Sequence, residues 1–120
     1  MAVILVVEDD FFILQSLEWV LEDMGHNTLP ASNLAGALAH LLAEQPIDAL
    51  FVDIRLDALP FGGYDVADQA IGLRPHLPVL CTSGSPLSHE MTGRFVPGAR
   101  FLQKPYSPAQ IEEFITETLC

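Results

Sequence analysis

The sequence predicts an α/β domain with a parallel β-sheet and helices on both of its faces. Short apolar runs rich in valine and isoleucine are typical of strands that are buried on both faces. Longer stretches with apolar residues at helical spacing separate these runs, and this alternation is typical of parallel sheets. The chain has 120 residues, half of them hydrophobic. This is enough for a real core, so we expect one domain over residues 1–120.

The first half of the chain alternates three predicted strands with two predicted helices. The strands are expected at 2–7, 27–31 and 47–52, and the helices at 12–24 and 33–45. The run AVILVV defines the first strand, and the second strand is the weakest of the three. Gly25 is a typical C-terminal stop for the first helix. Ser32 or Asn33 can cap the second helix, which is expected to end before Pro46.

The second half continues the same alternation. Strands are expected at 78–82 and 99–103, and helices at 64–73, 86–95 and 107–119. The helix at 86–95 is marginal because Gly93 lies inside it. The last helix has Ser107 as its cap, Pro108 in its first turn and Gln110 at the capping-box position.

Composition narrows the classes of partner. The formal net charge is −11, which disfavours direct binding of nucleic acid phosphates or anionic lipid. The two cysteines, Cys81 and Cys120, form neither a disulfide framework nor a zinc motif, so we expect a cytoplasmic, reducing location. The apolar N-terminus has no basic region and is soon interrupted by acids, so we expect neither a signal peptide nor a membrane span.

Polar side chains follow four of the predicted strands at their carboxyl ends. They are Glu8, Asp9 and Asp10 after the first strand, Asp53 after the third, Ser83 and Gly84 after the fourth, and Lys104 after the fifth. Parallel sheets bind ligands at this edge. Clustered carboxylates favour a hard cation, and Mg²⁺ keeps waters that a phosphate oxygen can replace. A carboxylate beside such an ion can attack phosphorus and form an acyl phosphate.

Four segments, in this order and spacing, resemble the receiver domain of two-component response regulators, and the resemblance covers essentially the whole chain. The segments are VILVVEDD, ALFVDIRL, PVLCTSG and FLQKPYS. The resemblance implies a flavodoxin-like fold with strand order 2-1-3-4-5.

The resemblance also implies a role for each site residue. Asp53 would be the phosphoacceptor, and Glu8 and Asp9 would hold Mg²⁺ together with Asp53 and the backbone carbonyl of Arg55. Two further residues complete the set at the other strand ends. Ser83 would contact the phosphoryl group and move on activation, and Lys104 would pair with the phosphoryl oxygens before a cis bond to Pro105. Phe101 stands at the aromatic switch position.

The chain departs from the family pattern at several positions. Glu8 stands where aspartate is commoner, and Asp57 replaces the usual proline four residues after the phosphoacceptor. The loop DALPFGG is longer than usual, and Phe101 lacks the hydroxyl group of a tyrosine.

Several neighbouring residues have simpler interpretations. Thr82 competes with Ser83 for the hydroxyl role, and strand alternation does not decide between them. Asp10 is expected to cap the first helix, Trp19 to contribute to packing, and the four histidines to lie on the surface or in loops.

The resemblance implies a switch that receives a phosphoryl group from a histidine kinase or a histidine phosphotransfer protein. We expect no catalysis beyond the chain's own aspartyl phosphorylation and dephosphorylation. The output partner would be a protein that meets the face formed by the segments 86–95, 99–103 and 107–119. The start at Met1 and the absence of a trailing linker favour a stand-alone, chemotaxis-receiver-like protein over a piece of a longer one. The alternatives are a phosphatase of the haloacid dehalogenase type and a flavodoxin-like cofactor module.

Overall fold

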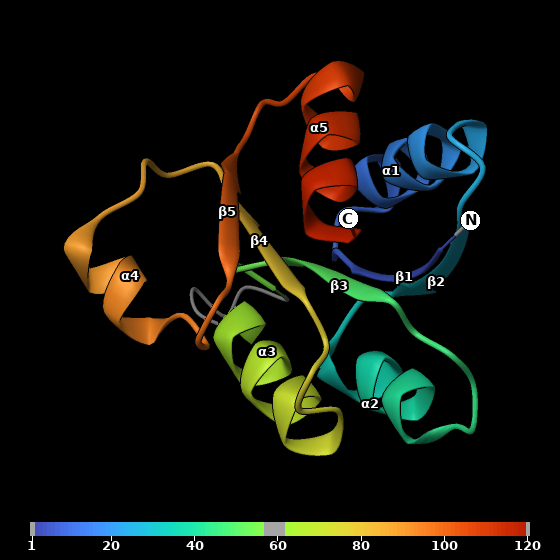
Figure 1. The fold of residues 1–120 in the computed structure, drawn as a ribbon. Helices are drawn as coiled ribbons and strands as arrows, with labels where there is room; N and C mark the ends of the chain where they lie inside the picture. Colours follow the sequence, from blue (N-terminus) through green and yellow to red (C-terminus); the bar gives the residue numbers. More distant parts are fainter. Residues whose placement is uncertain (1, 57–61, 120) are drawn as a thin grey trace.

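The structure is a computed structural model that describes residues 2–56 and 62–119. Five strands alternate with five helices along this part of the chain (Figure 1). The strands are β1 (Val3–Val7), β2 (Asn27–Ala31), β3 (Ala49–Asp53), β4 (Val79–Ser83) and β5 (Arg100–Gln103). The helices are α1 (Phe11–Asp23), α2 (Leu34–Leu42), α3 (Gly62–Leu73), α4 (His89–Arg94) and α5 (Pro108–Leu119).

The strands form one parallel sheet in the order β2-β1-β3-β4-β5, which confirms the predicted fold. Its register aligns the carboxyl ends of neighbouring strands. Val7 lies opposite Val52 in β3, and Asp53 lies opposite Thr82 in β4. Residues that end or follow different strands are therefore brought to one edge of the sheet.

Alternate residues of each strand face opposite sides of the sheet, and two hydrophobic cores result. On one side, Leu5, Val7, Leu50 and Val52 pack with residues of α2 and α3. On the other side, Ile4, Val6, Phe51 and Leu80 pack with residues of α1 and α5. Figure 1 shows the two pairs of helices on opposite faces of the sheet.

Several predicted helix caps are confirmed. The Asp10 carboxylate accepts hydrogen bonds from the backbone N–H groups of Phe12 and Ile13, so it caps α1. Asn33, and not Ser32, caps α2.

The start of α5 also follows the prediction. Ser107 and Gln110 exchange two hydrogen bonds there, as a capping box does.

Three details differ from the predictions. The helix expected at 33–45 ends at Leu42, and the one expected at 86–95 is limited to α4, with Ser88 as its cap. Trp19 was expected to contribute to packing, but 64% of it is exposed. Helical spacing alone does not reveal how far a neighbouring element covers each face of a helix. Within 2–56 and 62–119, no helix has both the length and the apolar character needed to cross a bilayer.

Candidate functional site

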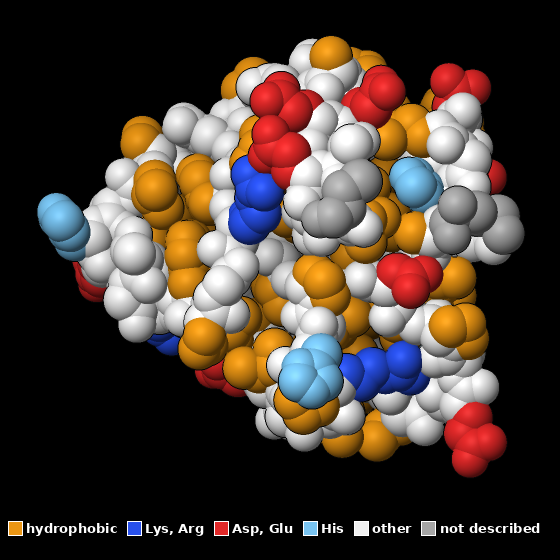
Figure 2. All heavy atoms as spheres, viewed as in Figure 1, with side chains coloured by type: hydrophobic (Ala, Val, Ile, Leu, Met, Phe, Trp, Pro, Cys, Tyr) orange, Lys and Arg blue, Asp and Glu red, His pale blue; other side chains and the backbone are white. Residues whose placement is uncertain are grey.

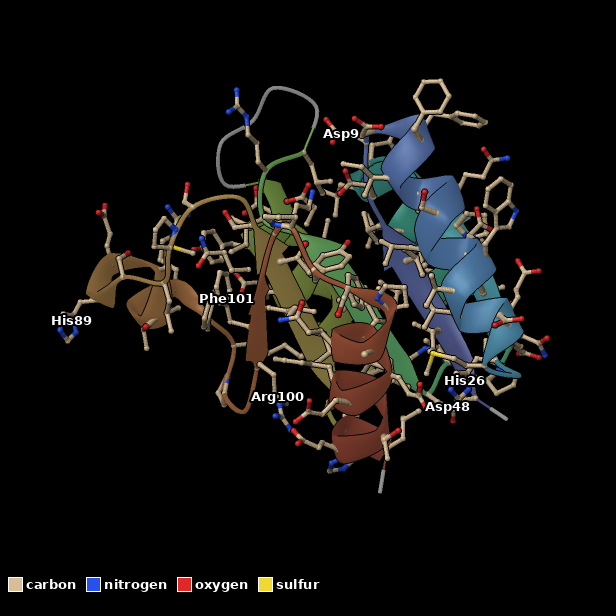
Figure 3. The ribbon with its side chains drawn as sticks, turned by 90° about the horizontal axis from the view of Figure 1, so that it is seen from above. Asp9, His26, Asp48, His89, Arg100 and Phe101 are labelled. Carbon is tan, nitrogen blue, oxygen red and sulfur yellow. The ribbon has the colours of Figure 1, made fainter. Side chains whose placement is uncertain are left out.

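Polar side chains from four strands meet around one cavity at the carboxyl edge of the sheet. The cavity has a volume of about 620 Å³, and its lining includes Glu8, Asp9, Asp53, Ser83 and Lys104. Asp9 lies at this edge, and Asp48 and His26 lie at the opposite end of the sheet (Figure 3). The structure thus brings together residues that are up to 96 positions apart in the sequence.

Lys104 is the central cation of this cavity. Its Nζ lies 2.7 Å from Oδ2 of Asp53 and 3.3 Å from Oε2 of Glu8. Burial alone lowers the pKa of Lys104, but the hydrogen bonds and charges of Asp53 and Glu8 outweigh this effect and leave the pKa raised. Lys104 therefore stays protonated and holds the two carboxylates together. The Lys104–Pro105 peptide bond is cis, as predicted.

Asp53 is the last residue of β3 and is only 6% exposed. The backbone N–H of Arg55 donates a hydrogen bond of 3.2 Å to its Oδ1. The structure thus places an N–H donor at one carboxylate oxygen and an ammonium donor at the other. Arg55 also lines the cavity, and the role of its carbonyl as a ligand stays a prediction.

Glu8, Asp9 and Asp53 form a cluster that can hold a metal ion. One carboxylate oxygen from each of these residues lies within 4.8 Å of the others. Oxygen-only ligands of this kind suit a hard cation such as Mg²⁺ or Ca²⁺. Glu8 and Asp53 are buried and Asp9 is exposed, so an ion could be reached from solvent on the side of Asp9.

The charge state of Glu8 reflects this crowding. Burial, and then the contact with Asp53, raise the pKa of Glu8 to about 8, although Lys104 acts in the opposite direction. Two buried carboxylates that share one ammonium group are not both ionised without cost, and a divalent cation would remove that cost. The donor set therefore fits a metal ion.

The structure separates Ser83 from its competitor, Thr82. Ser83 lines the cavity, and its Oγ accepts a hydrogen bond of 3.0 Å from the backbone N–H of Ser85. Thr82 is 1% exposed and is not among the residues that line the cavity. The geometry thus favours Ser83 as the hydroxyl that a ligand in the cavity would meet.

Phe101 does not line the cavity but is linked to it through two other rings. It stacks on Phe95 with 6.1 Å between ring centroids, and Phe95 lies 6.0 Å from the ring of Tyr64. Tyr64 lines the cavity, and Arg94 of α4 lies 4.6 Å above its ring. Figure 3 shows Phe101 on the α4 side of β5.

Sequence reasoning missed two residues of this region, Gly63 and Tyr64. The N–H of Gly63 donates a hydrogen bond of 2.7 Å to the carbonyl oxygen of Ile54, and a Cβ atom at Gly63 would lie 2.2 Å from the carbonyl oxygen of Asp53. Only glycine allows α3 to begin this close to the backbone of Asp53. The paired glycines just before the predicted helix at 64–73, which are the first two residues of α3, were the available signal. Asp57, which replaces the usual proline of the family pattern, lies outside the described residues.

Comparisons with known proteins agree with this geometry. Residues 4–116 match the family model of the response regulator receiver domain. The chain is 31% identical over 120 residues to the nitrogen assimilation regulatory protein NtrX of Azorhizobium caulinodans, and the alignment covers 97% of this chain and 26% of that protein.

Solved structures of receiver proteins are similar over almost the whole chain. A response regulator receiver protein from Sinorhizobium medicae has a TM-score of 0.88 and 30% identity, with 98% of this chain and 94% of that chain covered. A CheY-like receiver domain protein from Methanospirillum hungatei has a TM-score of 0.88 and 28% identity, with 99% and 94% covered.

These matches give no support to the alternative of a haloacid dehalogenase-type phosphatase. The chain spans only about a quarter of the length of the curated relatives that it matches, from 22% to 26%. The family match, however, extends over almost all of the 120 residues. The chain therefore belongs to the response regulator receiver domain family.

Proposed function

We propose that the chain receives a phosphoryl group on Asp53 from a histidine kinase or a histidine phosphotransfer protein, with Mg²⁺ bound by Glu8, Asp9 and Asp53. One observation carries this proposal. Asp53 is a buried carboxylate that belongs to a three-carboxylate cluster, and its Oδ2 lies 2.7 Å from the ammonium group of Lys104. That combination supplies a nucleophile, a cation for phosphoryl oxygens and a place for a divalent ion.

In the proposed transfer, a carboxylate oxygen of Asp53 attacks the phosphorus atom of a phosphohistidine. The phosphorus–nitrogen bond breaks, its electron pair stays on the imidazole, and that ring takes up a proton from water. Lys104 exchanges its carboxylate contact for a phosphoryl oxygen, and the hydroxyl of Ser83 donates to another. When bound, Mg²⁺ would neutralise charge on the phosphoryl oxygens and would add a second positive charge to that of Lys104.

The same residues are proposed to take part in dephosphorylation, which would end the signal. In dephosphorylation, water attacks the phosphorus atom, the phosphorus–oxygen bond to Asp53 breaks, and free phosphate and the carboxylate are formed. We propose that the chain catalyses only these reactions of its own aspartate and does not turn over small phosphate esters.

The proposed output is a change of the surface formed by α4, β5 and α5. Movement of Ser83 toward the phosphoryl group would disturb the neighbouring start of α4, and the contacts among Tyr64, Phe95 and Phe101 would pass this change to β5. A protein partner is proposed for this face. The net charge of −11 is the reason to propose no direct nucleic acid contact, and the cytoplasm is the proposed location.

Acetyl phosphate with Mg²⁺, followed by intact mass measurement, tests the acceptor. We expect the mass of one added phosphoryl group, lost in Asp53→Asn and blocked by a chelator. Asp68→Asn, which changes an exposed acid of α3, is the matched control and should be labelled like the unmodified chain. An adduct that persists in Asp53→Asn would show that another residue is the acceptor.

A further inference from the structure

α4 is held to the rest of the domain more loosely than the other described helices. It has six residues, none of which is buried, whereas each of the other described helices has at least two buried residues. All residues from 84 to 90 are exposed, and 53% of Leu87 is exposed. Figure 1 shows α4 on the outer side of β5, away from α1, α2 and α5, and Figure 2 shows hydrophobic side chains on the surface at this side of the molecule. The few side chains that attach α4 therefore decide where it lies.

A buried ring of α3, that of Tyr64, contacts the end of α4. The guanidinium carbon of Arg94 lies 4.6 Å from the centroid of this ring, within the roughly 6 Å reach of a cation–π interaction. The next residue, Phe95, lies 6.0 Å from the same ring and stacks on Phe101 of β5. Arg94 is exposed and Tyr64 is 2% exposed, so a cation attaches α4 to the core from the solvent side.

The segment that leads into α4 is attached at the cavity of Asp53. The Oγ of Ser83 accepts a hydrogen bond of 3.0 Å from the backbone N–H of Ser85. Ser83, Ser85 and Tyr64 all line the cavity, and so does Met91 of α4. The segment is thus fixed at its start by a hydroxyl of the cavity and at its end by a ring of the cavity.

The proposed phosphoryl group would act on these two attachments differently. If the Ser83 hydroxyl turns toward a phosphoryl oxygen, its Oγ moves away from the N–H of Ser85, and the first attachment is weakened. Arg94 is not among the described residues that line the cavity, so the second attachment is not displaced directly. This attachment must be overcome before α4 can leave its position. The contact of Arg94 with Tyr64 therefore opposes the conformational change.

We propose that the contact between Arg94 and Tyr64 is a latch that holds α4 in the arrangement of the unphosphorylated chain, and that its strength sets how readily the chain accepts a phosphoryl group. The inference rests on the proposed function, because the phosphoryl group on Asp53 is what opposes the latch. An interaction that exists in only one of two conformations shifts their equilibrium by its own free energy. For a cation–π contact at an exposed position, this is a change of about two- to fivefold.

Hydrogen exchange of residues 84–95, measured without any phosphodonor, tests the latch itself. Arg94→Gln removes the cation but keeps a polar side chain, and it should speed exchange of this segment about two- to fivefold. Arg94→Lys retains a cation and should keep most of the protection. Arg100→Gln is the matched control, because the guanidinium carbon of Arg100 lies 5.0 Å from the ring centroid of Phe114, outside α4, and the net charge changes equally. Equal exchange of residues 84–95 in Arg94→Gln and Arg100→Gln would overturn the proposal.

Labelling by acetyl phosphate then tests the effect on the switch. Arg94→Gln should be labelled faster than the unmodified chain, by up to about fivefold, and Arg100→Gln at the unmodified rate. In a Tyr64→Leu background, Arg94→Gln should have no further effect on exchange, because the ring that it contacts is gone. Faster exchange in Arg94→Gln with an unchanged labelling rate would mean that the contact is only structural, and would refute the latch.

The two measurements separate this inference from the proposed function. If Asp53 is not the acceptor, the unmodified chain itself is not labelled there, and the role of the latch in phosphorylation fails together with the proposed function. If the chain is labelled on Asp53 but Arg94→Gln behaves like Arg100→Gln, the proposed function stands and only the latch is refuted.

Discussion

Gly63→Ala is the substitution for which the structure gives the sharpest prediction. The added Cβ would lie 2.2 Å from the carbonyl oxygen of Asp53 and 2.5 Å from Cα of Ile54. Carbon–oxygen contacts in proteins are rarely closer than about 3.3 Å. The start of α3 and the end of β3 must therefore separate by about 1 Å, and both of the contacted atoms belong to the backbone. No side chain can rotate away to relieve the contact.

The expected change in the free energy of unfolding of Gly63→Ala follows from two opposing effects. Alanine is about 1 kcal/mol better than glycine inside a helix, and overpacking of a buried site costs about 1–3 kcal/mol, occasionally more. Because the contacts are with backbone atoms, we expect the cost of overpacking to lie at the upper end of that range. The free energy of unfolding should then fall by a net amount of about 2 kcal/mol. For a chain of this size, such a loss lowers Tm by very roughly 8 °C.

Gly72→Ala is the control within the same helix. A Cβ at Gly72 would have no neighbour within 4 Å, so this substitution should leave stability unchanged or raise it by up to about 1 kcal/mol. Urea unfolding followed by circular dichroism compares the two variants. Acetyl phosphate labelling should also fall in Gly63→Ala, because the shift moves the backbone of Asp53. If both variants are equally stable, the close approach of α3 to Asp53 is not the constraint described above.

Three further predictions concern the acidic cavity and its surroundings. The pKa of Glu8 is about 8 in the folded chain, against an ordinary value of 4.5. Without metal, the stabilisation from protonated Glu8 is therefore complete below pH 4.5 and declines as the pH rises to about 8, by at most about 1.4 kcal/mol per pH unit. Urea unfolding at several pH values in chelator should show this decline in the free energy of unfolding, and Glu8→Gln should flatten it. Mg²⁺ should raise Tm, and the increase should be larger at higher pH. Asp9→Asn should abolish this increase, and the control Asp68→Asn should retain it. An undiminished increase in Asp9→Asn would show that Asp9 is not a ligand of the metal site. Tyr64→Ala should cost about 3 kcal/mol in urea unfolding, because a buried ring is lost beneath Phe95; a cost below about 1 kcal/mol would mean that the ring contributes little to the packing of α4.

Strands and site residues could be predicted because they depend on local and topological rules. Runs such as AVILVV have few alternatives to a buried strand, and parallel strands share one carboxyl edge. Asp53 and Lys104 could therefore be placed together although they are 51 residues apart. The hydrogen bonds that Asp10 accepts at the start of α1 were predictable for the same reason, since a cap needs only its own neighbours.

The features that sequence reasoning missed depend on distances between elements. The requirement for glycine at residue 63 arises from the approach of α3 to β3, which no spacing pattern encodes. The exposure of Trp19 depends on how much of α1 is covered by α5. Tyr64 occupies an ordinary apolar position of a helix, and its link to Phe101 exists only because Phe95 lies between their rings.

The sharing of Lys104 between Asp53 and Glu8 has a consequence for electroneutrality. When a bound cation keeps all three carboxylates ionised, the one ammonium group leaves two negative charges uncompensated, and a divalent ion would cancel these whereas a monovalent ion would not. In the proposed transfer, the acyl phosphate of Asp53 would replace one negative charge by about two and would break this balance again. The excess charge would attract a nearby hydrogen-bond donor that can rotate, which would give the Ser83 hydroxyl an electrostatic reason to turn inward.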